Sequence, residues 1–213
     1  SYQGFTQDRY RVGTLPSINI NRGFQGRYAF NFNWQSRQIY RSGTLGEDGT
    51  TDFSYTLNDL TFIGSKKVGL NNTIAVGYLL RFDDSRIVHR SIQQFIVVSR
   101  YSKFRLAHRI STDQTFEQDD KTEFRIRYRL STEIPLNGQS ADRNEFYLKV
   151  NNEYLNSWQD SDYDLELRLI PMLGRIIRQQ CKMELGIDYR VNSFIESGSN
   201  HTFWVALNVY IKI

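Results

Sequence analysis

Charged and apolar residues alternate along the stretch 123-EFRIRYRLSTEI-134. The even positions are apolar apart from one threonine, whereas three odd positions are Arg125, Arg127 and Arg129. Successive side chains of a β-strand point to opposite faces, so a period of two predicts a strand with one apolar face and one charged face.

The same alternation recurs along the whole chain. It is clear in six further segments, at 24–34, 104–110, 145–154, 163–170, 183–191 and 201–213. It is weaker near 10–20, 52–63, 73–82 and 90–100. Turn-forming residues such as Asn137-Gly138 separate the segments, and no linker divides the chain. The pattern therefore predicts about eleven strands, no helix and a single all-β domain over residues 1–213.

Two all-β architectures fit strands with one apolar face. In a soluble sandwich or barrel the apolar face points inward, whereas in a membrane barrel it points outward. Soluble strands usually have about five or six residues, but a tilted membrane strand needs roughly nine to eleven. The longer spans seen here, with Tyr154, Tyr163 and Tyr189 toward the ends of the apolar phase, favour the membrane barrel.

The predicted fold is therefore a transmembrane antiparallel up-and-down β-barrel of about ten to twelve strands. Twelve strands are favoured because bacterial single-chain barrels have even numbers, and residues 1–9 offer one more segment. Composition agrees with this fold. The 14 Phe, 13 Tyr and 3 Trp residues interleave with polar residues at a mean hydropathy of −0.53. The one cysteine excludes an internal disulfide and a Cys-rich metal motif.

The charged phase of five clear strands predicts the contents of the lumen. It carries eight basic and nine acidic side chains, Asp113 among the acidic ones. A barrel of this size has a lumen only slightly wider than its own side chains, so these charges should pair there. A narrow polar or ion pore is the alternative. The predicted lumen network comprises Arg105, Arg109, Glu123, Arg125, Arg127, Arg129, Glu133, Glu145, Lys149, Glu153, Asp164, Glu166, Arg168, Glu184, Asp188 and Arg190.

Charge also bears on the partners of the protein. A net charge of +4 could indicate nucleic-acid binding, but that needs aromatic rings and arginines on the same face. Here they lie on opposite faces, so no nucleic-acid partner is expected.

Alternate connections are basic, as at Lys66, Lys67 and Arg143, or acidic, as at Glu47 and Asp48. The basic set contains mostly tight turns, which predicts a periplasmic rim and a periplasmic C-terminus.

Several motifs resemble an uncharacterised family of Bacteroidota outer-membrane β-barrels, domain-of-unknown-function family 2490. They are 104-FRLAHRI-110, 125-RIRYRL-130, the turn 134-IPLNG-138 and 147-YLKVNNEYLN-156. The segment 111-STDQTF-116 and the terminal Ile213 depart from the family pattern. The resemblance implies a location in the bacterial outer membrane, and it supplies no catalytic residue.

Outer-membrane enzymes that act on lipids use serine, histidine and an acidic or amide residue, so the three histidines are the positions to inspect. His108 lies in an apolar phase, and neither His89 nor His201 has a distinctive spacing to a nucleophile. No catalytic, cofactor-binding or metal-binding residue is predicted, and no cofactor is expected.

The expected function is a non-enzymatic outer-membrane barrel that acts as a structural or accessory subunit of a larger envelope complex. Its expected partners are outer-membrane lipid or lipopolysaccharide, which the acidic rim would meet through divalent cations, and other outer-membrane or periplasmic proteins. The alternatives are a narrow channel or uptake porin, a lipid-modifying enzyme and a soluble ligand-binding barrel.

Overall fold

The computed structural model describes residues 8–83, 86–117, 120–194 and 198–213. Within these ranges the chain forms eleven β-strands and no helix. The strands are β1 (Arg9–Gly23), β2 (Tyr28–Thr44), β3 (Thr50–Lys67), β4 (Asn72–Asp83), β5 (Arg86–Arg100), β6 (Arg105–Phe116), β7 (Glu123–Pro135), β8 (Phe146–Gln159), β9 (Asp162–Arg178), β10 (Cys181–Asn192) and β11 (Asn200–Lys212). Each predicted segment overlaps one strand, so the all-β prediction is confirmed.

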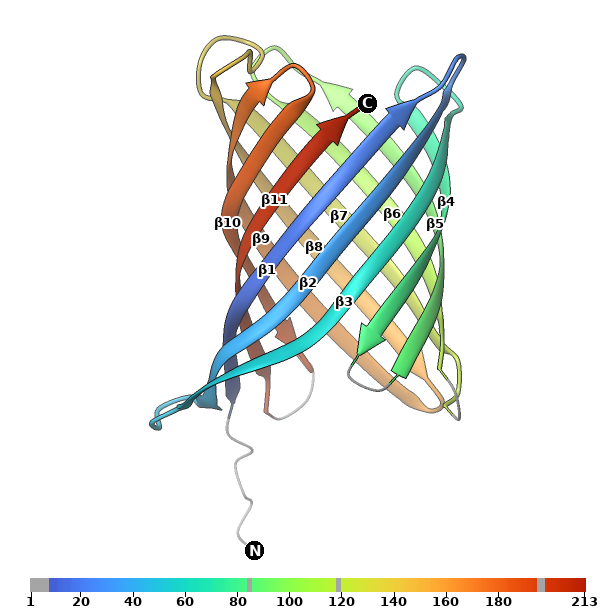
Figure 1. Cartoon of the computed structure of the whole chain (residues 1–213). Helices are drawn as coiled ribbons and strands as arrows, with labels where there is room; N and C mark the ends of the chain where they lie inside the picture. The colour runs from blue at the N-terminus through green and yellow to red at the C-terminus, as the bar shows by residue number, and fades with distance from the viewer. Residues whose placement is uncertain (1–7, 84–85, 118–119, 195–197) are drawn as a thin grey trace, which may run out of the picture.

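The strands close into one barrel in which each strand pairs with its neighbours along the chain (Figure 1). These consecutive pairs are all antiparallel, and the barrel closes where β1 pairs in parallel with β11. That seam runs in register from Arg9 opposite Asn200 to Asn21 opposite Lys212. In Figure 1 the start of β1 and the end of β11 lie at opposite ends of the barrel.

Eleven strands fall within the predicted range of ten to twelve but differ from the favoured number of twelve. Arg9 begins β1, and residues 1–7, which were considered for a further strand, lie outside the described residues. An up-and-down chain with an odd number of strands starts and finishes in the same direction. The parallel β1–β11 pair is the geometric consequence.

No helix within the described residues is long and apolar enough to cross a membrane.

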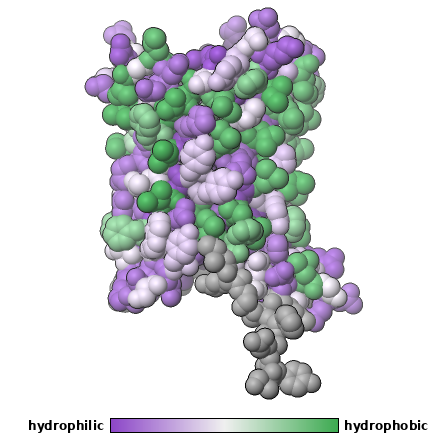
Figure 2. All heavy atoms as spheres, turned by 180° about the vertical axis from the view of Figure 1, so that it is seen from behind, coloured by the Kyte–Doolittle hydropathy of each residue, from purple (hydrophilic) through white to green (hydrophobic). Residues whose placement is uncertain are grey.

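The two faces of the barrel wall differ sharply in polarity. Val76, Leu185 and Val205 lie on the outer face and are 67%, 56% and 50% exposed. Buried charged residues include Glu153, which has no exposed surface, and Asp113. Hydrophobic residues cover much of the outer wall in Figure 2, with polar residues gathered at both ends. This arrangement is the reverse of a soluble barrel, which keeps its charges outside.

The connections form two rims. One rim holds residues 24–27, 68–71, 101–104, 136–145 and 179–180, together with the C-terminal end of β11. The opposite rim holds the connections between β2 and β3, β4 and β5, β6 and β7, β8 and β9, and β10 and β11. Four of the five connections at the first rim are tight, as predicted. However, the longest connection of the barrel, residues 136–145, also lies there, so connection length separates the rims less cleanly than the sequence suggested.

One part of the lumen is apolar. Leu15, Ile170, Met172, Trp204 and Ala206 form a buried cluster. These residues come from β1 and β11, which form the seam, and from β9, which lies beyond β10. The prediction of a polar, charged lumen therefore describes one side of the interior, and the seam side contributes a hydrophobic patch.

Candidate functional site in the barrel lumen

A row of five charged side chains crosses five neighbouring strands at one level of the lumen. Arg109 of β6 lies opposite Arg129 of β7, which lies opposite Glu153 of β8. Glu153 in turn lies opposite Arg168 of β9, which lies opposite Arg190 of β10. Like charges directly opposite each other across strands are destabilising, so the single carboxylate must compensate several arginines.

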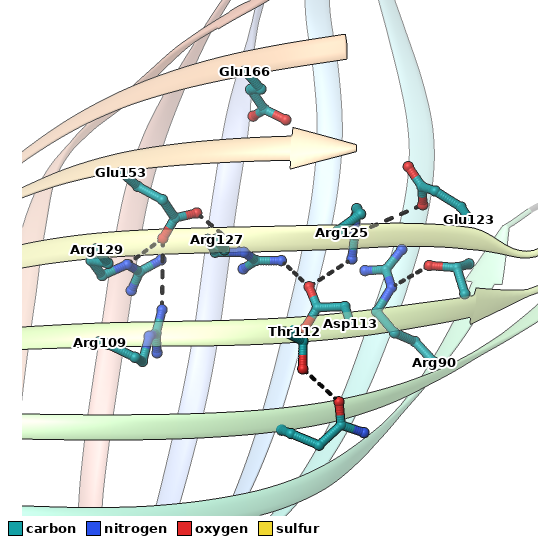
Figure 3. A network of polar contacts seen from close by, with 12 residues as sticks. Arg90, Arg109, Thr112, Asp113, Glu123, Arg125, Arg127, Arg129, Glu153 and Glu166 are labelled. Atoms are coloured by element: carbon teal, nitrogen blue, oxygen red, sulfur yellow. Dashed lines mark hydrogen bonds and ion pairs between the residues drawn. The ribbon is translucent and has the colours of Figure 1, made fainter. Parts of the chain in front are cut away.

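Glu153 performs that role by contacting four arginines, and Figure 3 shows three of them, Arg109, Arg127 and Arg129. Its Oε1 lies 3.0 Å from Arg168 Nη1 and 3.7 Å from Arg127 Nε. Its Oε2 lies 3.6 Å from Arg109 Nη2 and accepts a hydrogen bond from Arg129 Nε. The Glu153 carboxylate is therefore the centre of an ion-pair network that joins β6, β7, β8 and β9.

Asp113 forms a second centre nearby. Its Oδ2 accepts hydrogen bonds from Arg127 at 2.6 Å and from Arg125 at 3.2 Å. Arg125 Nε also lies 3.8 Å from a carboxylate oxygen of Glu123. Arg127 thus links Asp113 to Glu153, and Figure 3 shows the two centres side by side along β7.

A third centre lies closer to the rim that holds the C-terminus. Glu184 is almost fully buried and accepts hydrogen bonds from the Tyr147 hydroxyl at 2.8 Å and the Tyr210 hydroxyl at 3.1 Å. Lys149 Nζ lies 3.0 Å from both of its oxygens, and Lys182 Nζ lies 3.6 Å from Oε1. Two ammonium groups and two phenols therefore surround this carboxylate.

The remaining predicted residues occupy simpler positions. Arg168 donates to Glu166 at 2.5 Å, and Arg190 donates two hydrogen bonds to Asp188 at 2.9 and 2.7 Å. Arg105 lies 3.9 Å from Glu133 near the rim. Two carboxylates have backbone partners, because Glu145 accepts a hydrogen bond from the Asp142 amide and Asp164 accepts one from the Ser193 amide.

The predicted set omits several charged residues of the lumen, among them Arg37, Asp59, Arg81 and Arg90. Asp59 of β3 accepts two hydrogen bonds from Arg81 of β4, at 2.8 and 2.9 Å, and lies 3.6 Å from Arg37 of β2. Arg90 of β5 is only 5% exposed and donates to Thr115 at 2.8 Å. The signal for Arg81 and Arg90 was weak because their strands also place apolar residues in the lumen.

A cavity of about 880 Å³ lies inside the barrel. Its lining extends from Arg9 and His201 near one rim to Lys149 and Tyr210 toward the other. Among the described residues, twelve arginine or lysine side chains and eight aspartate or glutamate side chains line it. The lumen is therefore basic, in contrast to the balanced charge predicted from the clear strands alone.

The outer wall carries a polar group of its own. Ser91 and Gln93 of β5 lie opposite Gln114 and Thr112 of β6, on the same face as the exposed Val76. Thr112 donates to Gln93 at 2.8 Å, and the Gln93 and Gln114 amides exchange hydrogen bonds at 3.1 and 3.2 Å. We call these four residues the polar quartet. On the face drawn in Figure 2, polar residues likewise interrupt the hydrophobic wall.

The three histidines lie on different parts of the wall, and each bonds a tyrosine of the neighbouring strand. His89 contacts Tyr78, His108 contacts Tyr128 and His201 contacts Tyr189, each through Nδ1 at 2.8 Å. Among the described residues, no group of three or more histidine, cysteine or acidic side chains is arranged to hold a metal ion.

These features define a closed β-barrel with an apolar outer wall and an ion-paired basic lumen. The chain belongs to a family described as "Protein of unknown function (DUF2490)", whose pattern matches residues 12–201. This agrees with the resemblance seen in the sequence motifs. No curated protein and no solved structure matches the chain.

Proposed function

We propose that this protein is a non-enzymatic barrel of the bacterial outer membrane that serves as a structural or accessory subunit of an envelope complex. The observation that supports the membrane location is the reversed polarity of the wall. Val76 and Leu185 are more than half exposed, whereas Glu153 has no exposed surface. A closed barrel leaves no strand edge unpaired, which is what a hydrocarbon environment requires of β-structure.

The orientation follows from the rims. We place the rim that holds the C-terminal end of β11 in the periplasm, because its connections are basic, as at Lys103 and Arg143, whereas those of the opposite rim are acidic. The opposite rim, with Glu117, Asp120 and Asp160, then faces outward, where divalent cations can bridge carboxylates to lipopolysaccharide phosphates.

The accessory role is supported by the polar quartet. Gln93 lies near the middle of β5 and is exposed on a wall that is otherwise largely apolar. Polar side chains within a membrane are costly against lipid and stabilise contacts with another protein. The partner that fits is another membrane-embedded protein that contacts the β5–β6 wall.

The proposal is tested by extracting the protein from native membranes in mild detergent and weighing the eluted species by size exclusion and mass spectrometry. A photo-crosslinking residue at Gln93 should capture a partner, whereas the same residue at Val205, on the β11 wall, should not. We expect co-elution with another envelope protein at a constant ratio. A protein that stays soluble without detergent would refute the membrane location, and a clean monomer with no adduct from Gln93 would refute the accessory role.

The lumen cavity favours a second candidate, a narrow channel. The cavity lining extends along much of the barrel, and its excess of arginine would make it select anions. Planar-bilayer recordings test this directly: unitary currents with anion selectivity would support the channel, and their absence would exclude it.

A further inference from the structure

Arg90 is a buried lumen arginine that has no ion pair among the described residues. Its side chain lines the cavity but is only 5% exposed. Its one hydrogen bond goes from Nε to the neutral Thr115 hydroxyl, at 2.8 Å. Among the described residues no carboxylate oxygen lies within ion-pair distance of its guanidinium, although buried charges are ordinarily paired.

Other arginines lie around Arg90. Its charge interacts most strongly with that of Arg125, followed by those of Arg81 and of the Asp113 carboxylate. In Figure 3 the guanidinium groups of Arg90 and Arg125 lie beside each other, although the side chains come from β5 and β7. Asp59 is already bonded to Arg81, and Asp113 is already bonded to Arg125 and Arg127, so both carboxylates have other arginine partners.

Several of these arginines also have unused donors directed away from water. The Nε atoms of Arg125 and Arg37 are buried and have no hydrogen-bond acceptor among the described residues. Arg37, on β2, also lines the cavity, and its charge interacts with those of Arg81 and Arg190. Arg37 and Arg125 therefore each carry one buried donor without an acceptor among the described residues, although Arg37 lies 3.6 Å from Asp59 and Arg125 is bonded to Asp113.

We propose that the lumen binds a phosphate-class oxyanion at Arg90 and Arg125, with Arg37 contributing from β2. A tetrahedral oxyanion has several acceptor oxygens, which matches guanidinium groups that come from different strands. Its multiple negative charges also offset the excess of basic side chains around the cavity. The group bound is either a free inorganic ion or the phosphoryl group of a larger molecule. This inference concerns the lumen and does not depend on the partner proposed above.

The test uses the full chain purified in detergent, titrated calorimetrically with inorganic phosphate at constant ionic strength set by sodium chloride. We expect saturable binding that Arg90→Gln weakens by at least about tenfold, since it removes charge-assisted hydrogen bonds. Arg90→Lys, which keeps the charge and loses the planar fork, should bind with intermediate affinity. Arg105→Gln is the matched control, because Arg105 is a lumen-phase arginine outside the cavity lining; it should bind like the parent protein.

A second probe distinguishes the source of the group. Glycerol 3-phosphate that binds more tightly than phosphate would indicate a phosphoryl group carried by a larger molecule, and the reverse would indicate the free ion. If Arg90→Gln fails to fold, Arg37→Gln and Arg90→Lys provide the comparison. Absence of saturable binding at millimolar phosphate, or equal affinity in the Arg90 and Arg105 variants, would overturn the inference. Because binding is measured on the isolated protein, its failure leaves the co-elution result unaffected.

Discussion

Glu153→Gln is the substitution that most directly tests how the lumen is held together. The glutamine side chain has the same shape and nearly the same volume, so the change removes one negative charge without creating a cavity. It leaves Arg109, Arg129, Arg168 and Arg190 in one row without the carboxylate at its centre. The new amide nitrogen is also a donor, and it would face guanidinium groups that are themselves donors.

The size of the effect follows from the geometry. Ion pairs at 3.0, 3.6 and 3.7 Å each attract by roughly 5 kcal/mol at an effective dielectric constant of about 20. Most of that attraction is offset by the desolvation of a carboxylate with no exposed surface. Removing one partner of such a buried pair costs about 3–5 kcal/mol, because the other charges remain buried and unpaired. We therefore expect Glu153→Gln to lower the free energy of unfolding by about 4 kcal/mol.

The assay is denaturant unfolding of the barrel in detergent micelles, followed by tryptophan fluorescence, since Trp204 is buried beside the lumen. Glu133→Gln is the control, because Glu133 is partly exposed and its ion pairs are 3.9 and 4.0 Å long. That variant should lose less than about 1 kcal/mol. Equal losses in the two variants, or a loss below about 1 kcal/mol for Glu153→Gln, would refute the assignment of Glu153 as the centre of the network.

Three further substitutions test other parts of the barrel. Tyr147→Phe removes the hydroxyl that donates to Glu184 at 2.8 Å and should cost about 1–3 kcal/mol in the same unfolding assay. Gly174→Ala places a Cβ 2.1 Å from the Tyr147 ring, so it should cost about 1–3 kcal/mol through overpacking, and wild-type stability would contradict the packing seen here. Val205→Arg, on the outer wall, should cost about 2–4 kcal/mol when the barrel is refolded into lipid vesicles. Leu70→Arg, at a fully exposed turn position, should change stability by less than about 0.5 kcal/mol, and similar losses in the two variants would contradict a lipid-facing wall.

The sequence predicted the strands and their two faces because the environments on either side of the wall differ so strongly. Along β7 the charged residues at odd positions contact other charges in the lumen and the even residues face outward, as the alternation indicated. A period of two is a local property, so it can be read without knowing which strands are neighbours. The parity of the strand number is not local. It depends on how β1 pairs with β11. That pairing consists of 13 consecutive residue pairs between strands from opposite ends of the chain.

The missed arginines show where the alternation loses its information. Arg81 and Arg90 lie on strands whose lumen faces also carry the buried Leu79, Val88 and Ile92. The lumen phase of β4 and both phases of β5 mix polar and apolar residues, so the contrast that marks a lumen charge is weak there. Asp59, two residues from the buried Leu57, is hidden in the same way. An alternating pattern predicts a strand face that is mostly charged. It does not reveal a single charge on a strand face that also carries apolar residues.

A charge count by face also conceals where the charges lie along the barrel. Counting the clear strands gave a balance of basic and acidic residues, which favoured a neutral, closed interior. The register separates some of them instead: Glu133 and Glu145 lie near one rim and Glu123 lies near the other, whereas in the middle Glu153 pairs with four arginines. Carboxylates near the rims cannot compensate arginines in the middle, because ion pairing requires contact within a few ångströms. Arg90 itself lies opposite Thr115, which lies opposite Glu123, so it is level with a carboxylate near the rim. Glu123 pairs with Arg125 instead, and Arg90 has no ion pair among the described residues.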